Sequence, residues 1–456
     1  MNGFVPWNAH HARFTSGGRK SNTTNRSVTA RLVAGIFSPQ RPGLRLTPHS
    51  YSPSVLGKIL RASAREPSFA EAAEALKDLA EVTISPRQAG RIAHEVGQQL
   101  QADRDRDVVQ AQARTLKARV QTRPALAVAG VDGGRLQIRG QGDGPGAHDS
   151  SWREDKIAVL ATAAIHRSDC DPEPDLPDSF RNRGYVEKWV RGISGQGSMS
   201  PADPQAEIPA DPPATPPDTQ GKSRTRPELL VRTYVASTCS SDEFGPRVAA
   251  EAQRRNFLNA AHRAFLGDGA AWIWKLQQTY FPTFQAVVDF LHVLGHLFAA
   301  AKAVETATEP RWALFQSWAE ACWQGRVDQV IDQLRVLRDR LEPEPEAGTE
   351  GRDETDPRHI LTRELGYLEH NRERMDYPRY RQQGLPWTSS HVESTVKLFN
   401  RRVKGSEKFW GVPGAEAILQ LRAAFLSEDD RLSRHLKTQR CSSFRTYKAR
   451  EMRQAA

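Results

Sequence analysis

The amino-acid sequence predicts a protein of the α/β class whose sheet is interrupted and followed by long helical segments. Apolar runs of strand length occupy residues 125–131, 156–165, 228–238, 264–267 and 284–290. Apolar residues at helical spacing separate the later runs, and no strand signal returns after residue 292. Strands that alternate with helices are typical of parallel pairing, so we expect an antiparallel start to the sheet followed by parallel strands.

The first part of the sheet is predicted to be an antiparallel meander. Residues 126–131 are continuously apolar, as in a buried strand, and Asp132 ends this run. The two glycines that follow are expected to make a bend. The alternating residues 135–139 then return as a second strand, and residues 156–165 supply the third.

The composition indicates a soluble protein with a polyanionic partner. With 456 residues, the chain is long enough for two or three compact units. Its net charge of +10 favours nucleic acid as the partner. The four cysteines form no Cys-x-x-Cys pair, which argues against a zinc site or a disulfide framework and fits a reducing cytoplasm. No apolar stretch reaches the roughly 18 residues of a membrane span, and the N-terminus lacks the core of a signal peptide.

Changes in composition along the chain divide it into eight segments. We expect a disordered basic arm (1–52), a helical DNA-binding domain (53–122), a first part of the sheet domain (123–169), a Pro-rich linker or insertion (170–226), a second part of the sheet domain (227–292), a helical insertion (293–385), a helix that returns to the sheet domain with its following helix (386–430), and a basic tail (431–456).

Two helices near the N-terminus are predicted to form a unit that resembles a helix-turn-helix. Ser68 begins a capping-box pattern for the first helix, and Ser85 can cap the second. The second helix would then direct Arg87, Gln88 and Arg91 outward, toward a DNA groove. An ordinary helical hairpin without a DNA-binding role is the alternative.

Acidic residues stand at three positions where a metal site could form. Asp132 follows the first strand, Asp268 follows a later strand, and Glu393 lies in the first turn of a late helix. In the predicted order of strands, the first and fourth lie side by side, so both aspartates come within reach of each other. A helix packed across that edge could add Glu393.

Clustered carboxylates favour a divalent cation, because like charges at short range oppose ionisation. Mg²⁺ or Mn²⁺ is the natural partner, and two such ions support in-line displacement at a phosphate. Each residue also has a simpler interpretation. Asp132 could be a turn residue before two glycines, and Glu393 could complete a capping box that Ser390 begins.

Four motifs in order, "GVDGGR", "FLGDGAAWIW", "VVDFLH" and "HVESTVKLFNRRVKGSEKFW", give the chain a resemblance to a known family. Between residues 60 and 430 it resembles bacterial insertion-sequence transposases of the Asp-Asp-Glu class, nearest the Kra-type and Mutator-like groups. The resemblance implies a ribonuclease-H-like catalytic core, with an all-α insertion between the second aspartate and the glutamate.

The resemblance also implies roles for individual residues. Asp132 and Asp268 become the two metal-binding aspartates and Glu393 the third ligand of two Mg²⁺ or Mn²⁺ ions. Asp289 and His292 match the family's Asp/Cys-x-x-His pair and would be accessory active-site residues. The alternative for His292 is an ordinary histidine of an apolar core.

Basic residues follow Glu393 at helical spacing. Lys397, Arg401 and Lys404 share roughly one face, where DNA phosphates could lie. The alternative is a solvated basic face with an ion pair between Glu393 and Lys397.

Together, these features predict a metal-dependent transposase that cuts phosphodiester bonds at the ends of an element and joins the 3′ hydroxyls to target DNA. We expect double-stranded DNA as the partner, a homo-oligomer on DNA because two ends must meet, no membrane association, and a location in the bacterial cytoplasm near the nucleoid. A nuclease without strand transfer and a catalytically inactive DNA-binding descendant are the alternatives. A glycosidase with two carboxylates would leave the basic surplus unexplained.

Overall fold

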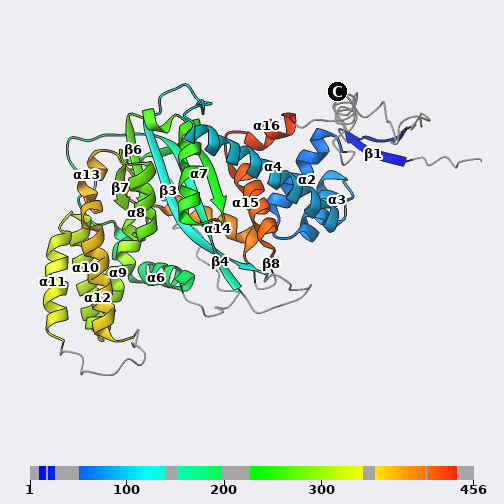
Figure 1. Cartoon of the computed structure of the whole chain (residues 1–456). Coiled ribbons are helices and arrows are strands. Elements are labelled where there is room, and N and C mark those ends of the chain that lie inside the picture. Colours follow the sequence, from blue (N-terminus) through cyan, green and yellow to red (C-terminus); the bar gives the residue numbers. More distant parts are fainter. Residues whose placement is uncertain are drawn as a thin grey trace, which may run out of the picture. The chain divides into compact units, whose positions relative to one another are not determined.

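A computed structural model describes residues 10–16, 19–25, 51–139, 151–197, 226–341, 355–405 and 408–438 (Figure 1). For residues 10–25 and 192–197, only the backbone is described. The chain forms two compact units. We call the first the helical unit (Met1–Asp103, Arg401–Val403 and Gly411–Ala456) and the second the sheet unit (Arg104–Asn400 and Lys404–Trp410).

The sheet unit is built on a mixed six-stranded sheet, in agreement with the predicted α/β class. Its strands follow the order β5-β4-β3-β6-β7, and the short strand β8 also pairs with β3. The pairs β3–β4 and β4–β5 are antiparallel, whereas β3–β6, β6–β7 and β3–β8 are parallel. The bounds are β3 (Leu126–Ile138), β4 (Ser151–Ala164), β5 (Glu228–Ser237), β6 (His262–Gly267), β7 (Gln285–Val288) and β8 (Phe409–Trp410).

Strand β3 corrects the predicted meander. It runs without a break through Gly133 and Gly134, and both glycines pair with β4. Neither has a positive φ, so no bend forms. Instead, the missing side chains leave space for side chains of β4, since a Cβ on Gly134 would lie 2.7 Å from Oδ1 of Asp155. The prediction that residues 135–139 form a returning strand is therefore wrong, and Asp132 lies within a strand rather than at its end.

Helices cover both faces of this sheet. On one face, α8 (Ala271–Tyr280) packs so closely that a Cβ on Gly267 would meet Ile273. Helix α7 (Ser241–Arg254) lies on the same face, and Arg255, directly after it, donates to Thr233 of β5 at 3.0 Å. On the opposite face, a Cβ on Gly130 would lie 2.4 Å from Val392 of α14 (Ser390–Val403). The late helix that the sequence predicts to return to the sheet thus packs directly against the central strand.

Residues 293–385, which the sequence predicts to be helical, form helices where the structure describes them. Helices α9, α10, α11 and α12 lie side by side (Figure 1). Phe290, Trp323 and Trp387 form an aromatic cluster at the base of this bundle, with ring centroids 4.7–6.1 Å apart. The bounds are α9 (Phe290–Val304), α10 (Thr308–Trp323), α11 (Val327–Asp339), α12 (Pro357–Asn371) and α13 (Tyr377–Gln382).

The predicted linker 170–226 is partly regular. Helices α5 (Asp178–Arg181) and α6 (Arg183–Gly197) lie in it, and its residues 198–225 are outside the described part of the chain.

The helical unit contains the predicted N-terminal pair of helices within a larger bundle. Ser68 accepts the Glu71 N–H at 3.1 Å and caps α3, and Ser85 accepts the Gln88 N–H at 3.2 Å at the start of α4. Helix α4 extends to Gln112, and the missing side chain of Gly97 lets it approach the Ala417 carbonyl of α15 closely. The bounds are α2 (Pro53–Arg65), α3 (Phe69–Ala80), α4 (Pro86–Gln112), α15 (Val412–Leu426) and α16 (Arg431–Thr438).

Both ends of the chain contain regular elements that the sequence did not predict. In the segment 1–52, strands β1 (His10–Ser16) and β2 (Arg19–Asn25) pair antiparallel, and the rest up to residue 50 is outside the described residues. In the tail 431–456, α16 is helical, and residues 439–456 are not described.

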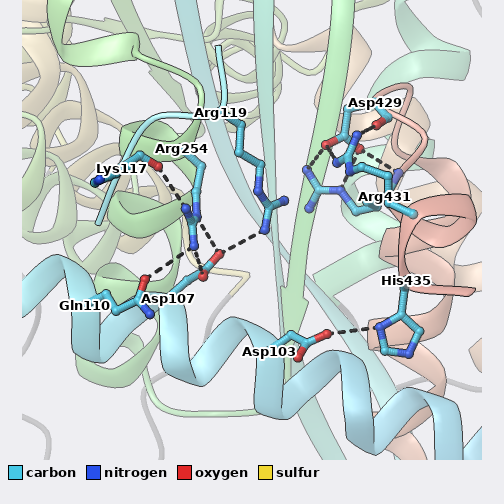
Figure 2. A network of polar contacts seen from close by, with 10 residues as sticks. Asp103, Asp107, Gln110, Lys117, Arg119, Arg254, Asp429, Arg431 and His435 are labelled. Carbon is cyan, nitrogen blue, oxygen red and sulfur yellow. Dashed lines mark hydrogen bonds and ion pairs between the residues drawn. The ribbon is translucent and has the colours of Figure 1, made fainter. Parts of the chain in front are cut away.

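Polar contacts anchor α4 within each unit (Figure 2). In the sheet unit, the Arg254 guanidinium donates to Asp107 at 2.9 Å and to the Lys117 carbonyl at 2.8 Å. In the helical unit, His435 of α16 contacts Asp103 at 3.0 Å. Among the described residues, no helix has the length and apolar character needed to cross a membrane.

Candidate active site

The strand register brings three aspartates to the α14 face of the sheet. Gly130 faces α14, so Asp132, two residues further along β3, faces the same side. Strand β6 pairs with β3 up to Leu266, and Asp268 follows directly after its end. Strand β7 pairs with β6, and the Asp289 N–H donates to the Gly267 carbonyl at 2.9 Å. Three neighbouring strands therefore each deliver one acidic residue.

Asp289 is the most firmly held of these acids. As N-cap of α9 it accepts the Leu291 N–H at 3.2 Å, while its Oδ2 contacts His292 Nδ1 at 2.9 Å and accepts the Ser389 hydroxyl at 2.7 Å. Burial raises the pKa of a carboxyl group, but the hydrogen bonds and the charge of His292 outweigh it and lower the pKa of Asp289. Asp289 is therefore ionised.

His292 belongs to the acidic cluster and not to an apolar core. Its Nδ1 lies 3.8 Å from Glu393 Oε1, in addition to its contact with Asp289. Burial lowers its pKa, but the bond to Asp289 and the charges of Asp289, Glu393 and Asp268 outweigh this and raise the pKa to about 10. The imidazole is therefore a cation placed between two acids.

Glu393 is a buried acid with an open coordination position. It is 7% exposed, and its Oε1 has no hydrogen-bond partner. Burial and the charges of Asp289 and Asp132 raise its pKa to about 8, although His292 and Lys397 oppose this. The capping-box alternative is not found, because the N-cap of α14 is Ser389, which makes no capping bond and donates to Asp289 instead.

Asp132 and Asp268 occupy the other side of the cluster. Burial and the charge of Asp268 raise the pKa of Asp132 to about 7, although His292 and the Gly133 N–H, which donates to Asp132 Oδ1 at 2.6 Å, oppose the rise. Asp268 Oδ1 accepts the Ala270 N–H at 2.8 Å. The interpretation of Asp132 as a turn residue is therefore wrong, since it lies inside a paired strand.

The tightest group of potential ligand atoms differs from the predicted trio. In the part of the chain that the structure describes, Asp289, His292 and Glu393 each offer one such atom within 4.8 Å of the others. Asp132 and Asp268 are linked to this group by charge rather than by such close contact. The structure thus brings all five predicted residues into one neighbourhood, with the Asp-x-x-His pair closest to Glu393.

The donor set fits a hard divalent cation. Carboxylate oxygens from β3, β6 and α14 are ligands that Mg²⁺ and Mn²⁺ prefer. The pKa values of Asp132 and Glu393 are raised, and Oε1 of Glu393 has no hydrogen-bond partner. Protein groups therefore do not fully compensate the negative charge that these acids carry when ionised. A cation would supply the missing compensation.

Three residues near the cluster carry no recognisable sequence signal. Ser389 fixes Asp289, and the Tyr367 hydroxyl of α12 donates to the Asp268 carbonyl at 2.7 Å. Asp155 faces α14 from β4, opposite Gly134. A lone tyrosine in a helical stretch and an aspartate just before a predicted strand are common, so only spatial neighbours reveal them.

The predicted DNA-contacting residues lie at or near the surface of their units. In the sheet unit, Lys397 lies 5.4 Å from the ring of Trp189 and Lys404 lies 5.8 Å from that of Trp152. No ion pair joins Lys397 to Glu393 among the described residues, so the predicted alternative is not found. In the helical unit, Arg87, Arg91 and Arg401 are exposed, and Gln88 accepts from Arg91 at 3.0 Å.

The fold and the site define an α/β protein with an acidic cluster on three adjacent strands and helix α14, and with one histidine within it. The sequence matches no protein-family model and no curated protein.

Proposed function

We propose that the chain is a DNA transposase of an insertion sequence that cuts and joins phosphodiester bonds with two Mg²⁺ or Mn²⁺ ions. The observation that carries this proposal is the convergence of Asp132, Asp268 and Glu393 from β3, β6 and α14 on one buried acidic cluster that His292 compensates only in part. A basic protein whose buried acids have His292 as a single, incomplete counter-charge is well suited to a metal that also contacts phosphate.

The strand order supports a ribonuclease-H-like core. Three antiparallel strands are followed by two parallel ones, and the strand of Asp132 is the neighbour of the strand that leads to Asp268. The helices α9–α13 stand between Asp268 and Glu393 in the sequence, where the family resemblance places an all-α insertion.

When bound, the two ions would activate an attacking oxygen and stabilise a leaving oxygen in an in-line displacement. The chain's own residues prepare this site. Asp132, Asp268 and Glu393 would hold the ions, and Asp289 orients His292 through the 2.9 Å contact at Nδ1. The His292 cation, 3.8 Å from Glu393, would oppose the rise in the pKa of this carboxyl group and offer its other ring nitrogen to a phosphate oxygen.

DNA would contact basic residues in both units. Lys397 and Arg401 lie on α14, the helix that carries Glu393, and Lys404 follows directly after it. Arg87, Gln88 and Arg91 would help recognise the element's terminal repeats. A homo-oligomer on DNA follows from the need to join two ends.

The test is cleavage of DNA that carries the ends of the element from which the reading frame comes, with Mg²⁺ or Mn²⁺. We expect Asp132→Asn, Asp268→Asn and Glu393→Gln each to lower the cleavage rate by at least about 100-fold, since even outer-shell partners of a metal contribute about 10- to 100-fold. Asp242→Asn is the matched control, because Asp242 is exposed on α7, on the other face of the sheet.

The products separate the alternatives. Joined products with target DNA support a transposase, whereas cleavage without joining would indicate a nuclease. If the three site variants bind and process DNA as well as the unchanged protein does, the catalytic proposal is wrong and a DNA-binding descendant is the better description.

A further inference from the structure

We infer that the helical insertion positions the active-site acids through tyrosine hydroxyls, chiefly through the hydrogen bond from Tyr367 to the backbone of Asp268. This inference rests on the proposed function for its catalytic meaning, but its structural part stands on contacts within the sheet unit. Tyr367 is a positioning residue, since it touches the backbone of a proposed ligand and not the reacting atoms.

Three tyrosines of the insertion donate to backbone carbonyls at the end of the sheet. Tyr367 of α12 donates to the Asp268 carbonyl at 2.7 Å. Tyr377 of α13 donates to the carbonyl of Val288, the residue before Asp289, at 3.1 Å. Tyr380 donates further back in β7, to the Ala286 carbonyl, at 3.3 Å. Two of these three bonds therefore end at or next to a site aspartate.

The Tyr367 ring is held by neighbours from α9 and from the turn after Asp268. It stacks on His296 of α9, with ring centroids 3.5 Å apart and an angle of 18°. The Nδ1 of His296 in turn contacts the carboxylate of Glu364, one turn before Tyr367 on α12. Tyr367 also packs against Gly269, where a Cβ would lie 2.4 Å from the ring. A ring that is held in this way directs its hydroxyl to one place.

The turn that contains Asp268 depends on this hydroxyl. Strand β6 ends at Gly267, so the Asp268 carbonyl has no strand partner in the described structure, and Tyr367 is its donor. Gly269 has a φ of +109°, which lets the chain turn sharply, and the Ala270 N–H donates to the Asp268 carboxylate. The turn is thus held at the carbonyl by the insertion and at the carboxylate by its own backbone.

The hydroxyl remains a donor at all physiological pH values. Burial and the negative charges of Asp268, Asp289 and Glu364 raise the pKa of Tyr367 well above its usual value. Only the protonated hydroxyl can donate to a carbonyl.

The experiment compares two matched variants of the full-length protein, Tyr367→Phe and Tyr380→Phe. Each removes one hydroxyl that donates from the insertion to a backbone carbonyl of the sheet end. Only the Tyr367 hydroxyl contacts one of the proposed acidic ligands, at the carbonyl of Asp268. In the metal-free protein, hydrogen exchange of the amides of residues 268–270 is expected to become roughly 2- to 10-fold faster in Tyr367→Phe, the factor that one net hydrogen bond contributes. Tyr380→Phe should leave it unchanged.

The second measurement is Mn²⁺ affinity, followed by electron paramagnetic resonance. We expect Tyr367→Phe to weaken binding by about 10-fold, the lower end of the range for outer-shell partners of metal ligands, and Tyr380→Phe to leave it unchanged. A merely structural role would lower thermal stability similarly in both variants and leave Mn²⁺ affinity equal.

The outcomes separate this inference from the proposed function. Unchanged exchange at residues 268–270 in Tyr367→Phe, or equal Mn²⁺ affinity in the two variants, would overturn the positioning role. If the unchanged protein shows no Mn²⁺ binding that Asp268→Asn abolishes, the proposed function fails. In that case, the exchange measurement still decides whether Tyr367 holds the Asp268 turn.

Discussion

Asp155 is a carboxylate inside the sheet unit whose oxygens have no hydrogen-bond partner on another residue. It is 0% exposed on β4. Burial is the main cause that raises its pKa to about 6, and Glu154 raises it further. The backbone N–H of Asp155 itself and the charges of Lys404 and Lys156 offset only part of the rise. A buried acid of this kind favours its protonated form, so folding stability depends on pH.

The sign of this dependence follows from the pKa values. The folded-state pKa of Asp155 lies above its ordinary value of 3.8, so the folded protein binds the proton more tightly and loses stability as pH rises from about 4 to about 6. The loss is at most about 3 kcal/mol. Asp155→Asn is expected to remove it. Thermal unfolding at about pH 4 and about pH 7 measures this. The stability of the variant relative to the unchanged protein should be greater at the higher pH.

A control distinguishes this effect from general acid titration. Asp242→Asn changes an exposed aspartate that pairs with Lys275, and it should leave the pH dependence as it is. If Asp155→Asn and Asp242→Asn show the same pH dependence, Asp155 does not carry the effect.

At the level of elements, α14 reaches the site because a glycine lets it approach the sheet. A Cβ on Gly130 of β3 would lie 2.4 Å from Cγ2 of Val392, which is closer than side chains tolerate. Glu393 is the residue after Val392 on α14, so the close approach of this helix to β3 determines where the glutamate side chain lies.

Gly130→Ala is therefore expected to destabilise the protein. The added methyl group overpacks the contact between β3 and α14, at a cost of about 1 to 3 kcal/mol. Gly366→Ala on α12 is the matched control, because nothing lies within 4 Å of its Cβ and alanine favours a helix by about 1 kcal/mol. Thermal unfolding should give shifts of opposite sign. A Gly130→Ala protein as stable as the unchanged one would contradict this account of α14 packing.

At the level of the whole molecule, the net charge of +10 gives the proposed DNA binding a measurable signature. The affinity for DNA should fall steeply as salt concentration rises, because each phosphate contact releases counterions. Lys404, which is exposed and follows α14, is one of the proposed phosphate contacts.

Lys404→Ala is expected to weaken DNA binding and to reduce the slope of log affinity against log salt by about 1. Fluorescence anisotropy at several salt concentrations measures both. Lys275→Ala removes the same charge on α8, where Lys275 pairs with Asp242, and should leave the slope nearly unchanged. Equal slopes for the two variants would place the DNA elsewhere.

Much of the element order was predictable from local patterns. The apolar run 264–267 lies in β6, the predicted strand 284–290 contains β7 but ends earlier, at Val288, and the helix that carries Glu393 is α14. These predictions succeeded because apolar periodicity and capping residues report on the burial of a residue and its near neighbours in sequence. The neighbouring positions of Asp132 and Asp268 followed from the strand order.

The sequence by itself therefore determined the α/β class, the placement of most helices and strands, and the acidic residues to examine. Only the tertiary structure decided that Gly133 continues a strand, that Ser389 holds Asp289 instead of capping its helix, and that Tyr367 holds the Asp268 turn. The physical reason is that these outcomes depend on hydrogen bonds and pairing between residues far apart in the chain, and local periodicity carries no information about such partners.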